Sequence, residues 1–239
     1  MAAAAERVAL VTGAAGGIGS AIAARLAADG WDVHAVDVPD GDLATREGNR
    51  AVVDAALERF GRLDAVVANA GFQHVAPVED FPEDTWEALL AVLLTSPFLL
   101  AKYAWPALRA SGDGRFLAVA SVHGLVASPY KAGYVAAKHG VLGLVKTLAL
   151  EGAADGISAS ALCPGFVRTP LVEAQVAAQA AAHDLPEEEV LERVILERAA
   201  VKRLLEPEEV AEAAAFLLGP AGRAATGSPL ILDLGWLAH

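Results

Sequence analysis

The sequence predicts an α/β fold in which a mostly parallel sheet is covered by helices on both faces. Three observations support this prediction. Short apolar runs rich in β-branched residues alternate with segments of helical periodicity. These runs are apolar nearly throughout, as in strands that are buried on both sides. A glycine-rich turn follows the first run and leads into a helix, the order found in a Rossmann-like doubly wound sheet.

Six segments are predicted as strands, and helices separate most of them. The strands are Val8–Thr12, Val33–Asp37, Asp64–Asn69, Arg115–Ala120, Ile157–Leu162 and Pro229–Asp233, and the most clearly patterned helices are Ile18–Gly30, Arg46–Phe60, Trp86–Phe98 and Glu208–Leu218.

The connection after the second predicted strand is short. Its only strongly helical part is Arg46–Phe60. The helix and strand that many doubly wound folds place here are therefore predicted to be missing or shortened. Val38–Thr45, which holds Pro39 and Gly41, is predicted to be a turn-rich bypass. Leu171–Leu205 lies outside the strand pattern and is predicted to form a helical lid.

Length and composition limit the possible functions. The 239 residues suit one domain, residues 1–239. The net charge of −12, without a run of lysine and arginine, argues against a nucleic-acid partner. The single cysteine, Cys163, excludes an internal disulfide and a cysteine-based zinc site, and no metal is predicted. Ala88–Ala101 falls short of a bilayer span, and the N-terminus does not resemble a secretory signal, so a cytoplasmic protein is expected.

The turn Thr12–Gly19 predicts a dinucleotide site. Glycines let the backbone approach a pyrophosphate, whose charge then lies at the helix N-terminus. Asp37 ends the second strand, where a carboxylate accepts hydrogen bonds from ribose hydroxyls and repels a 2′-phosphate. NAD is therefore favoured over NADP. The alternatives are a tight turn without a ligand and an aspartate that only begins the turn before Pro39.

Ser121, Tyr134 and Lys138 form the second constellation. Tyr134 and Lys138 are four residues apart in a helical pattern, so their side chains share one face. An ammonium beside a phenol stabilises the phenolate and lowers its pKa toward the range of a general base. Ser121, at a strand end, can hydrogen-bond a substrate oxygen. A solvated Tyr–Lys surface pair is the alternative.

These motifs, together with Asn69–Gly71 and with Pro164-Gly165 followed by Thr169, resemble the short-chain dehydrogenase/reductase family over nearly the whole chain. The resemblance implies that Ser121, Tyr134 and Lys138 are catalytic, that Thr169 contacts the nicotinamide carboxamide, and that the protein is a homotetramer or dimer. For Thr169, a helix N-cap is the alternative. The implied cofactor contacts are Gly13, Ala15, Gly17, Ile18, Gly19, Asp37, Asp42, Asn69, Ala70, Gly71, Tyr134, Lys138, Pro164, Gly165, Val167 and Thr169.

Within that family, the segments Gly71–Pro77, Ser121–Ser128 and Val167–Glu173 are most similar to the D-3-hydroxybutyrate dehydrogenases. This likeness implies that Gln73, His123, Lys131 and Gln175 hold the carboxylate of the substrate, beside Phe166 in the pocket. Each of the four has an ordinary alternative: a loop or helix surface for the glutamines, solvent for the lysine, a backbone hydrogen bond for the histidine. Trp236 is predicted to close the pocket, to form a subunit contact or to pack in the core.

The chain departs from the family pattern at three places. Leu93 stands where the family usually carries a catalytic asparagine, so slower proton exchange is expected. Phe166 stands where the hydroxybutyrate enzymes usually have tryptophan, which predicts a roomier pocket. The short Val38–Thr45 segment is expected to remove much of the adenine-side wall, although Asp42 can replace one adenine contact, and NAD affinity is expected to be weak.

The sequence leaves three functions open. The first is NAD-dependent, reversible oxidation of D-3-hydroxybutyrate or a close 3-hydroxy acid to the ketone, by a cytoplasmic enzyme whose partner is that small molecule and neither nucleic acid nor membrane. The second is a dehydrogenase for another secondary alcohol. The third is an NAD(H)-binding protein with little catalysis, a hypothesis suggested by Leu93 and by the short Val38–Thr45 segment.

Overall fold

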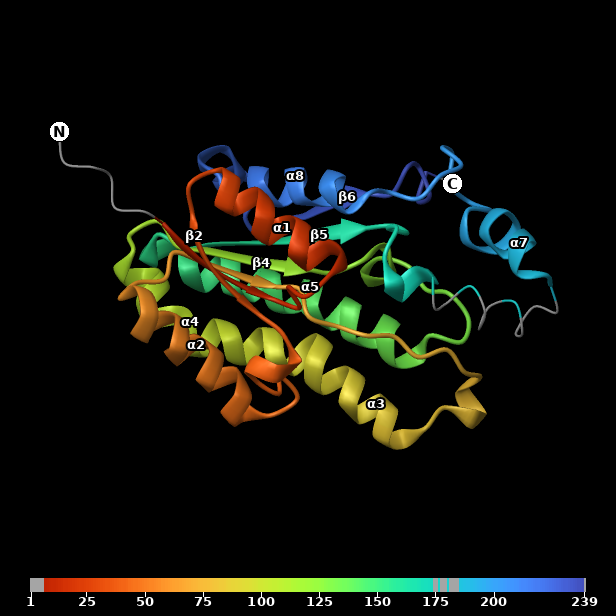
Figure 1. Cartoon of the computed structure of the whole chain (residues 1–239), viewed down its shortest axis with the longest axis horizontal. Coiled ribbons are helices and arrows are strands. Elements are labelled where there is room, and N and C mark those ends of the chain that lie inside the picture. The colour runs from red at the N-terminus through yellow and green to blue at the C-terminus, as the bar shows by residue number, and fades with distance from the viewer. Residues whose placement is uncertain (1–6, 174–175, 177–179, 181–184, 239) are drawn as a thin grey trace.

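The computed structural model describes residues 7–173, 176, 180 and 185–238. Its six strands form one parallel sheet in the order β2-β1-β3-β4-β5-β6 (Figure 1). The predicted strands are confirmed within two residues at each end, and their bounds are β1 Val8–Thr12, β2 Asp32–Val36, β3 Ala65–Ala68, β4 Arg115–Val119, β5 Ser158–Pro164 and β6 Pro229–Leu232.

Helices cover both faces of the sheet, as the apolar strands predict. In β1, Val8 and Leu10 face one core, whereas Ala9 and Val11 face the other, because successive side chains of a strand point to opposite faces. The first core includes residues of α2 (Arg46–Phe60), α4 (Ser96–Ala110) and α5 (Ala132–Gly152), and the second includes residues of α1 (Gly17–Ala28) and α8 (Pro207–Leu218) (Figure 1).

The predicted shortening after β2 is confirmed. A single 3₁₀ turn, η1 (Val38–Asp40), leads to α2, and β3 pairs with β1 rather than beyond β2. Asn49 of α2 holds this bypass in place. Its buried amide Nδ2 donates to the carbonyls of Leu43 and Thr45, and its Oδ1 accepts from Ser96 Oγ at 2.6 Å.

The helical region after β3 is longer than the predicted Trp86–Phe98. It runs from Glu83 to Ala110 through α3 (Glu83–Leu90), a π-helical turn η3 (Ala91–Thr95) and α4. By length and mean hydropathy, 1.5, this stretch could cross a membrane, but 44% of its most apolar window is buried inside the structure, as in a core helix of the α/β layer.

The predicted lid is helical only in part. A short helix, α7 (Glu187–Val190), continues into a π-helical turn, η6 (Leu191–Ile195), and the chain from Leu196 to Leu205 is irregular. The predicted helical character is therefore confirmed at residues 171–173 and over Glu187–Ile195, and it is wrong for residues 196–205. Val190 and Ile195 pack with Val122 and Trp236 in a separate small core, which orders the irregular segment through burial instead of helical hydrogen bonds.

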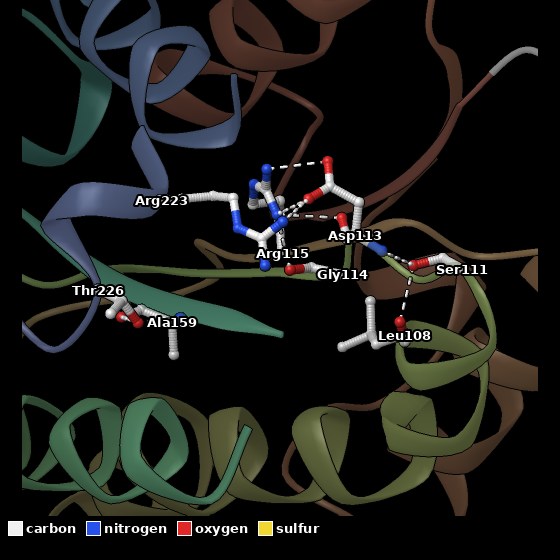
Figure 2. A network of polar contacts seen from close by, with 8 residues as sticks. All are labelled: Leu108, Ser111, Asp113, Gly114, Arg115, Ala159, Arg223 and Thr226. Carbon is white, nitrogen blue, oxygen red and sulfur yellow. Dashed lines mark hydrogen bonds and ion pairs between the residues drawn. The ribbon is translucent and has the colours of Figure 1, made fainter. Parts of the chain in front are cut away.

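An arginine is buried at the amino end of β4, opposite the carboxyl ends of the strands. Arg115 is 2% exposed, and its Nη2 donates to Asp113 Oδ2 at 2.9 Å (Figure 2). The same carboxylate accepts from Arg223 Nη1 at 2.8 Å. Asp113 thereby ties the start of β4 to the turn η7 (Pro220–Ala225) that precedes β6.

Candidate functional site

A cleft of about 500 Å³ lies at the carboxyl ends of the strands, lined by the segments that follow β1 to β5. This is where open parallel sheets bind ligands. Among the predicted site residues that the structure describes, Ala15 and Gly19 do not line the cleft, and Gln175 lies outside the described residues. Those that do line it are Gly13, Gly17, Ile18, Asp37, Asp42, Asn69, Ala70, Gly71, Gln73, Ser121, His123, Lys131, Tyr134, Lys138, Pro164, Gly165, Phe166, Val167 and Thr169.

The glycine turn lines the cleft largely with backbone, because the space beside two of its glycines leaves no room for a side chain. Gly13 has φ +66°, and a Cβ there would lie 2.7 Å from the Cα of Ala70. A Cβ at Gly19 would collide with the carbonyl oxygen of Gly13. Asn69 secures the turn by donating from Nδ2 to the carbonyls of Thr12 and Gly13. This side-chain-free cradle at the N-terminus of α1 fits the pyrophosphate of a dinucleotide.

Asp37 lies at the rim of the same turn. Its Oδ2 accepts from the Ala15 N–H and its Oδ1 from the Val38 N–H, both at 2.8 Å. These bonds fix the carboxylate beside the glycine turn. Ala15 thus positions Asp37 rather than lining the cleft.

The short segment after Asp37 still forms a wall. Val38, Gly41, Asp42 and Leu43 all line the cleft. Asp42 Oδ1 accepts from the Ala44 N–H at 2.9 Å, which shapes the turn. The shortened segment therefore still supplies part of the wall, and weak NAD affinity stays a prediction.

The predicted catalytic side chains meet in the middle of the cleft. Ser121 follows β4 and is the N-cap of the 3₁₀ turn η4 (Val122–Gly124), where its Oγ accepts from the His123 N–H at 3.1 Å. Ser121 is also hydrogen-bonded to Tyr134. The Lys138 Nζ lies 5.5 Å from the centre of the Tyr134 ring and donates to the Val119 carbonyl at 2.7 Å.

Burial controls the charges of this trio. It raises the pKa of Tyr134, and the hydrogen bond from Ser121 opposes that rise. Burial also lowers the pKa of Lys138 to about 8. The expected lowering of the Tyr134 pKa by Lys138 does not appear in the protein alone. Burial is the largest cause and raises that pKa, and the Lys138 ammonium donates to the Val119 carbonyl.

His123 is buried beside Ser121. Its Nδ1 lies 3.5 Å from Ser121 Oγ, and its Nε2 lies 2.9 Å from Ser128 Oγ. Burial, and then the nearby positive charge of Lys131, lower the pKa of the imidazole to about 3, so the ring is neutral. Trp236 packs against its ring at 5.8 Å without lining the main cleft, so the core-packing alternative for Trp236 is the one that the structure favours.

Two further polar side chains, Gln73 and Lys131, and the ring of Phe166 also line the cleft. The Gln73 Nε2 is buried and has no hydrogen-bond partner in the part of the chain that the structure describes. Lys131 is 3% exposed, and its Nζ lies 5.3 Å from the Phe166 ring centre. Burial lowers the pKa of Lys131 to about 8. An amide donor and a cation in one cleft are the groups that recognise a small anion.

Thr169 combines both of its predicted positions. Its Oγ1 accepts from the Val172 N–H at 3.4 Å, which is an N-cap contact, and the residue also lines the cleft. A Cβ at Gly17 would lie 3.1 Å from its Cγ2. The N-cap and cofactor readings of Thr169 are therefore compatible.

Leu93 lies in the π-helical turn η3 and is 2% exposed. It packs with Leu89 and Ala137 in an apolar cluster that reaches Tyr134. A Cβ at Gly71 would lie 2.6 Å from Leu93 Cδ2, so the leucine fills the space beside the turn after β3.

Sequence reasoning missed most of the apolar lining of the cleft. These residues carry no motif, and only their positions next to motif residues could have indicated them. They include Val38, Leu43, Phe72, Val92, Val119, Val122, Pro170, Leu171 and Val172.

A dinucleotide cradle joined to a Ser–Tyr–Lys set defines the class of protein: an oxidoreductase that uses NAD or NADP. A family model described as enoyl-(acyl carrier protein) reductase matches residues 13–237. The chain belongs to the short-chain dehydrogenase/reductase family, whose members act on secondary alcohols and ketones.

Individual relatives cover almost the whole chain. The chain is 42% identical to the uncharacterized oxidoreductase YxjF of Bacillus subtilis, with 98% of this chain and 99% of the relative covered. It is 40% identical to the D-beta-hydroxybutyrate dehydrogenase of Cupriavidus necator, with 98% of both covered. Among solved structures, levodione reductase superposes with a TM-score of 0.90 at 31% identity, with 98% of both chains covered.

Proposed function

We propose that this protein catalyses the reversible, NAD-dependent oxidation of D-3-hydroxybutyrate, or a close 3-hydroxy acid, to the corresponding ketone. The observation that carries the proposal is the buried Gln73 Nε2, a donor without a partner among the described residues, in the same cleft as Lys131. Burying a donor in that way costs free energy unless a ligand satisfies it. A carboxylate held there is within the cleft that contains Tyr134.

Each polar residue of the cleft has a separate role in the proposed reaction. Tyr134, as the phenolate, takes the hydroxyl proton of the substrate. Ser121 donates a hydrogen bond to the reacting oxygen, and Lys138 supplies positive charge that stabilises the phenolate when the site is filled. The glycine turn and Asn69–Gly71 hold the cofactor, with Pro164, Gly165, Val167 and Thr169 on its nicotinamide side. A nicotinamide cofactor bound there would supply the acceptor for the hydride of the carbinol carbon.

Asp37 is the basis for proposing NAD rather than NADP. Its carboxylate is held at the rim of the cradle by two backbone N–H groups. A ribose hydroxyl can donate to such a carboxylate, whereas a 2′-phosphate would be repelled by it.

His123 was also expected to hold the substrate carboxylate. Both of its ring nitrogens already lie near hydroxyl groups of the protein. We therefore assign the carboxylate to Gln73 and Lys131, and give His123 a different role below.

The proposal extends to the assembly. We propose one cytoplasmic domain over residues 1–239 that forms a homotetramer, with a dimer as the alternative. Exposed apolar side chains on α4 and α5, Phe98 and Leu150, support a helix-to-helix contact between copies. Light scattering on the protein as it elutes from a size-exclusion column measures the mass of the assembly directly.

Oxidation of a different secondary alcohol is the second candidate. The lining of the cleft is mainly apolar around Phe72, Val92 and Phe166, which suits a substrate without a carboxylate. Retained activity of Lys131→Ala on an uncharged alcohol, together with no activity of the wild type on 3-hydroxy acids, would favour this candidate. Binding of NADH without turnover of any alcohol would favour the third function, a cofactor-binding protein.

The deciding experiment follows NADH formation with D-3-hydroxybutyrate and NAD. The L-enantiomer, NADP and the Tyr134→Phe variant are run beside it. Reaction of only the D-acid with NAD, and loss of that reaction in the variant, is the expected result. Oxidation of uncharged alcohols but of no 3-hydroxy acid would contradict the proposed substrate, and it would leave the proposed role of Tyr134 intact.

A further inference from the structure

Ser128 lies outside the cleft lining but contacts a residue of the catalytic site. Its Oγ is 2.9 Å from His123 Nε2, and His123 Nδ1 is 3.5 Å from Ser121 Oγ. Ser128 is half-buried, in the loop between η4 and α5. The imidazole therefore bridges two hydroxyl groups, one at the reacting centre and one outside it.

The number of protons in this bridge limits the possible hydrogen-bond directions. A neutral imidazole has one N–H donor and one acceptor nitrogen. Either Nδ1 donates to Ser121 and Nε2 accepts from Ser128, or both directions are reversed. The buried surroundings and the charge of Lys131 keep His123 neutral, so the doubly protonated ring is excluded near pH 7.

Ser121 distinguishes these two arrangements. Its Oγ already accepts from the His123 backbone N–H at 3.1 Å. The hydroxyl has a single proton, which must point at Tyr134 and the substrate oxygen if Ser121 is to stabilise negative charge there. That proton is then unavailable to His123, so Nδ1 must be the donor.

The second nitrogen then needs a donor of its own. With its proton on Nδ1, the ring presents a bare Nε2 beside the Ser128 hydroxyl. The remaining neighbours of the imidazole in the described residues include the rings of Tyr134, Phe166 and Trp236, which pack against it at centroid distances of 5.8 to 6.2 Å. A ring enclosed in this way has little freedom to turn toward another donor.

We propose that Ser128 is a positioning residue that selects the Nδ1–H tautomer of His123 and thereby directs the Ser121 proton to the reacting oxygen. Ser128 O–H donates to Nε2, Nδ1–H donates to Ser121 Oγ, and both acceptor sites of Ser121 are filled. This inference rests on the proposed role of Ser121 as a donor to the substrate oxygen. It is independent of which secondary alcohol is the substrate.

The kinetic test compares Ser128→Ala with Ser128→Thr, which keeps the hydroxyl. Ser111→Ala is the matched control, because Ser111 is also a half-buried serine but lies before β4 at the other end of the sheet. Ser128→Ala is expected to lower kcat at least roughly tenfold. This decrease is smaller than the roughly 10²- to 10³-fold loss of kcat that follows removal of a whole oxyanion-hole donor. Its KM should change little, because Ser128 does not touch the cleft, and Ser128→Thr should restore most of kcat. Equal kcat in Ser128→Ala and Ser111→Ala would overturn the proposal.

The spectroscopic test needs no substrate. The ¹⁵N shifts of the His123 ring, assigned by their loss in His123→Gln, report which nitrogen carries the proton. We expect a protonated Nδ1 and a bare Nε2 at neutral pH, with Ser128→Ala shifting the population toward Nε2–H. An Nε2–H ring in the wild-type protein would overturn the proposal. If no alcohol is turned over, the proposed function fails and the tautomer measurement alone decides the role of Ser128.

Discussion

The Lys138 ammonium donates a 2.7 Å hydrogen bond to the carbonyl oxygen of Val119, the last residue of β4. One bond thus joins the second turn of α5 to the strand end that precedes Ser121. The Lys138 Nζ lies 5.5 Å from the centre of the Tyr134 ring. The charge is deeply buried, which lowers the pKa of Lys138 to about 8.

This burial predicts a pH dependence of stability. Between the folded pKa of about 8 and the ordinary value of 10.5, the unfolded chain binds more protons than the folded one. The contribution of Lys138 to the free energy of unfolding therefore rises with pH across that window, by on the order of 3 kcal/mol. Urea unfolding from pH 7.5 to 10 should show this rise in the wild type relative to Lys138→Met. Parallel pH profiles of the two proteins would contradict it.

Lys131 predicts a pH-dependent affinity for the substrate. Its pKa of about 8 means that the ammonium is lost as the pH rises through that value. The KM for D-3-hydroxybutyrate should therefore increase above pH 8. Lys131→Met should raise that KM at pH 7 by roughly tenfold or more, the size expected for a hydrogen bond to a charged group. An uncharged secondary alcohol is the control, and an equal rise in its KM would argue against a carboxylate contact.

Asp37 predicts cofactor preference. Replacing Asp37 by serine removes the charge that opposes a 2′-phosphate while keeping a hydroxyl that can accept one backbone hydrogen bond. The ratio of kcat/KM for NAD over NADP should fall by at least roughly tenfold, or about 1.4 kcal/mol. Asp32→Ser, at the other end of β2, is the matched control. A ratio that stays constant in Asp37→Ser would remove the basis for NAD preference.

Replacing Leu93 by asparagine is expected to increase turnover and to decrease stability. An asparagine at this position brings a polar group to the apolar side of Tyr134, where it can hold water for proton exchange. Leu93→Asn should raise kcat and lower the free energy of unfolding by about 1–3 kcal/mol, since the amide is buried among Leu89 and Ala137. Leu93→Ala loses the packing without gaining the amide and should not raise kcat. Unchanged turnover in Leu93→Asn would show that proton exchange does not limit the reaction.

Loss of the Asp113 carboxylate is expected to lower the free energy of unfolding more than loss of its exposed partner Arg223. Asp113→Ala leaves the buried Arg115 guanidinium without its carboxylate, although two backbone carbonyls remain as acceptors. The free energy of unfolding should fall by about 2 kcal/mol, less than for a fully buried pair because Asp113 is half exposed. Arg223→Ala, which removes an exposed partner, should cost less than about 1 kcal/mol. Urea unfolding of both variants checks this order, and equal costs would contradict the burial argument.

Local sequence determined the sheet and the location of the cleft. Apolar runs between helical patterns gave the six strands, because residues covered on both faces must be apolar along their whole length. The short connection after Asp37 predicted the missing strand, since too few residues remain there for another helix and strand. The glycine turn and the four-residue spacing of Tyr134 and Lys138 indicated the candidate site, because both signals are local in the chain.

Tertiary packing decided what these local signals do not contain. The end of the lid helix, the wall formed by Val38 and Leu43, and the raised pKa of Tyr134 all depend on residues distant in sequence. The same holds for His123, for which the family resemblance implies a substrate contact and whose ring nitrogens lie near the hydroxyl groups of Ser121 and Ser128. Hydrogen-bond direction, desolvation and pocket shape arise from groups that meet only in three dimensions. The sequence therefore indicated the polar residues of the candidate site, and the folded structure determined its apolar lining and the state of those polar residues.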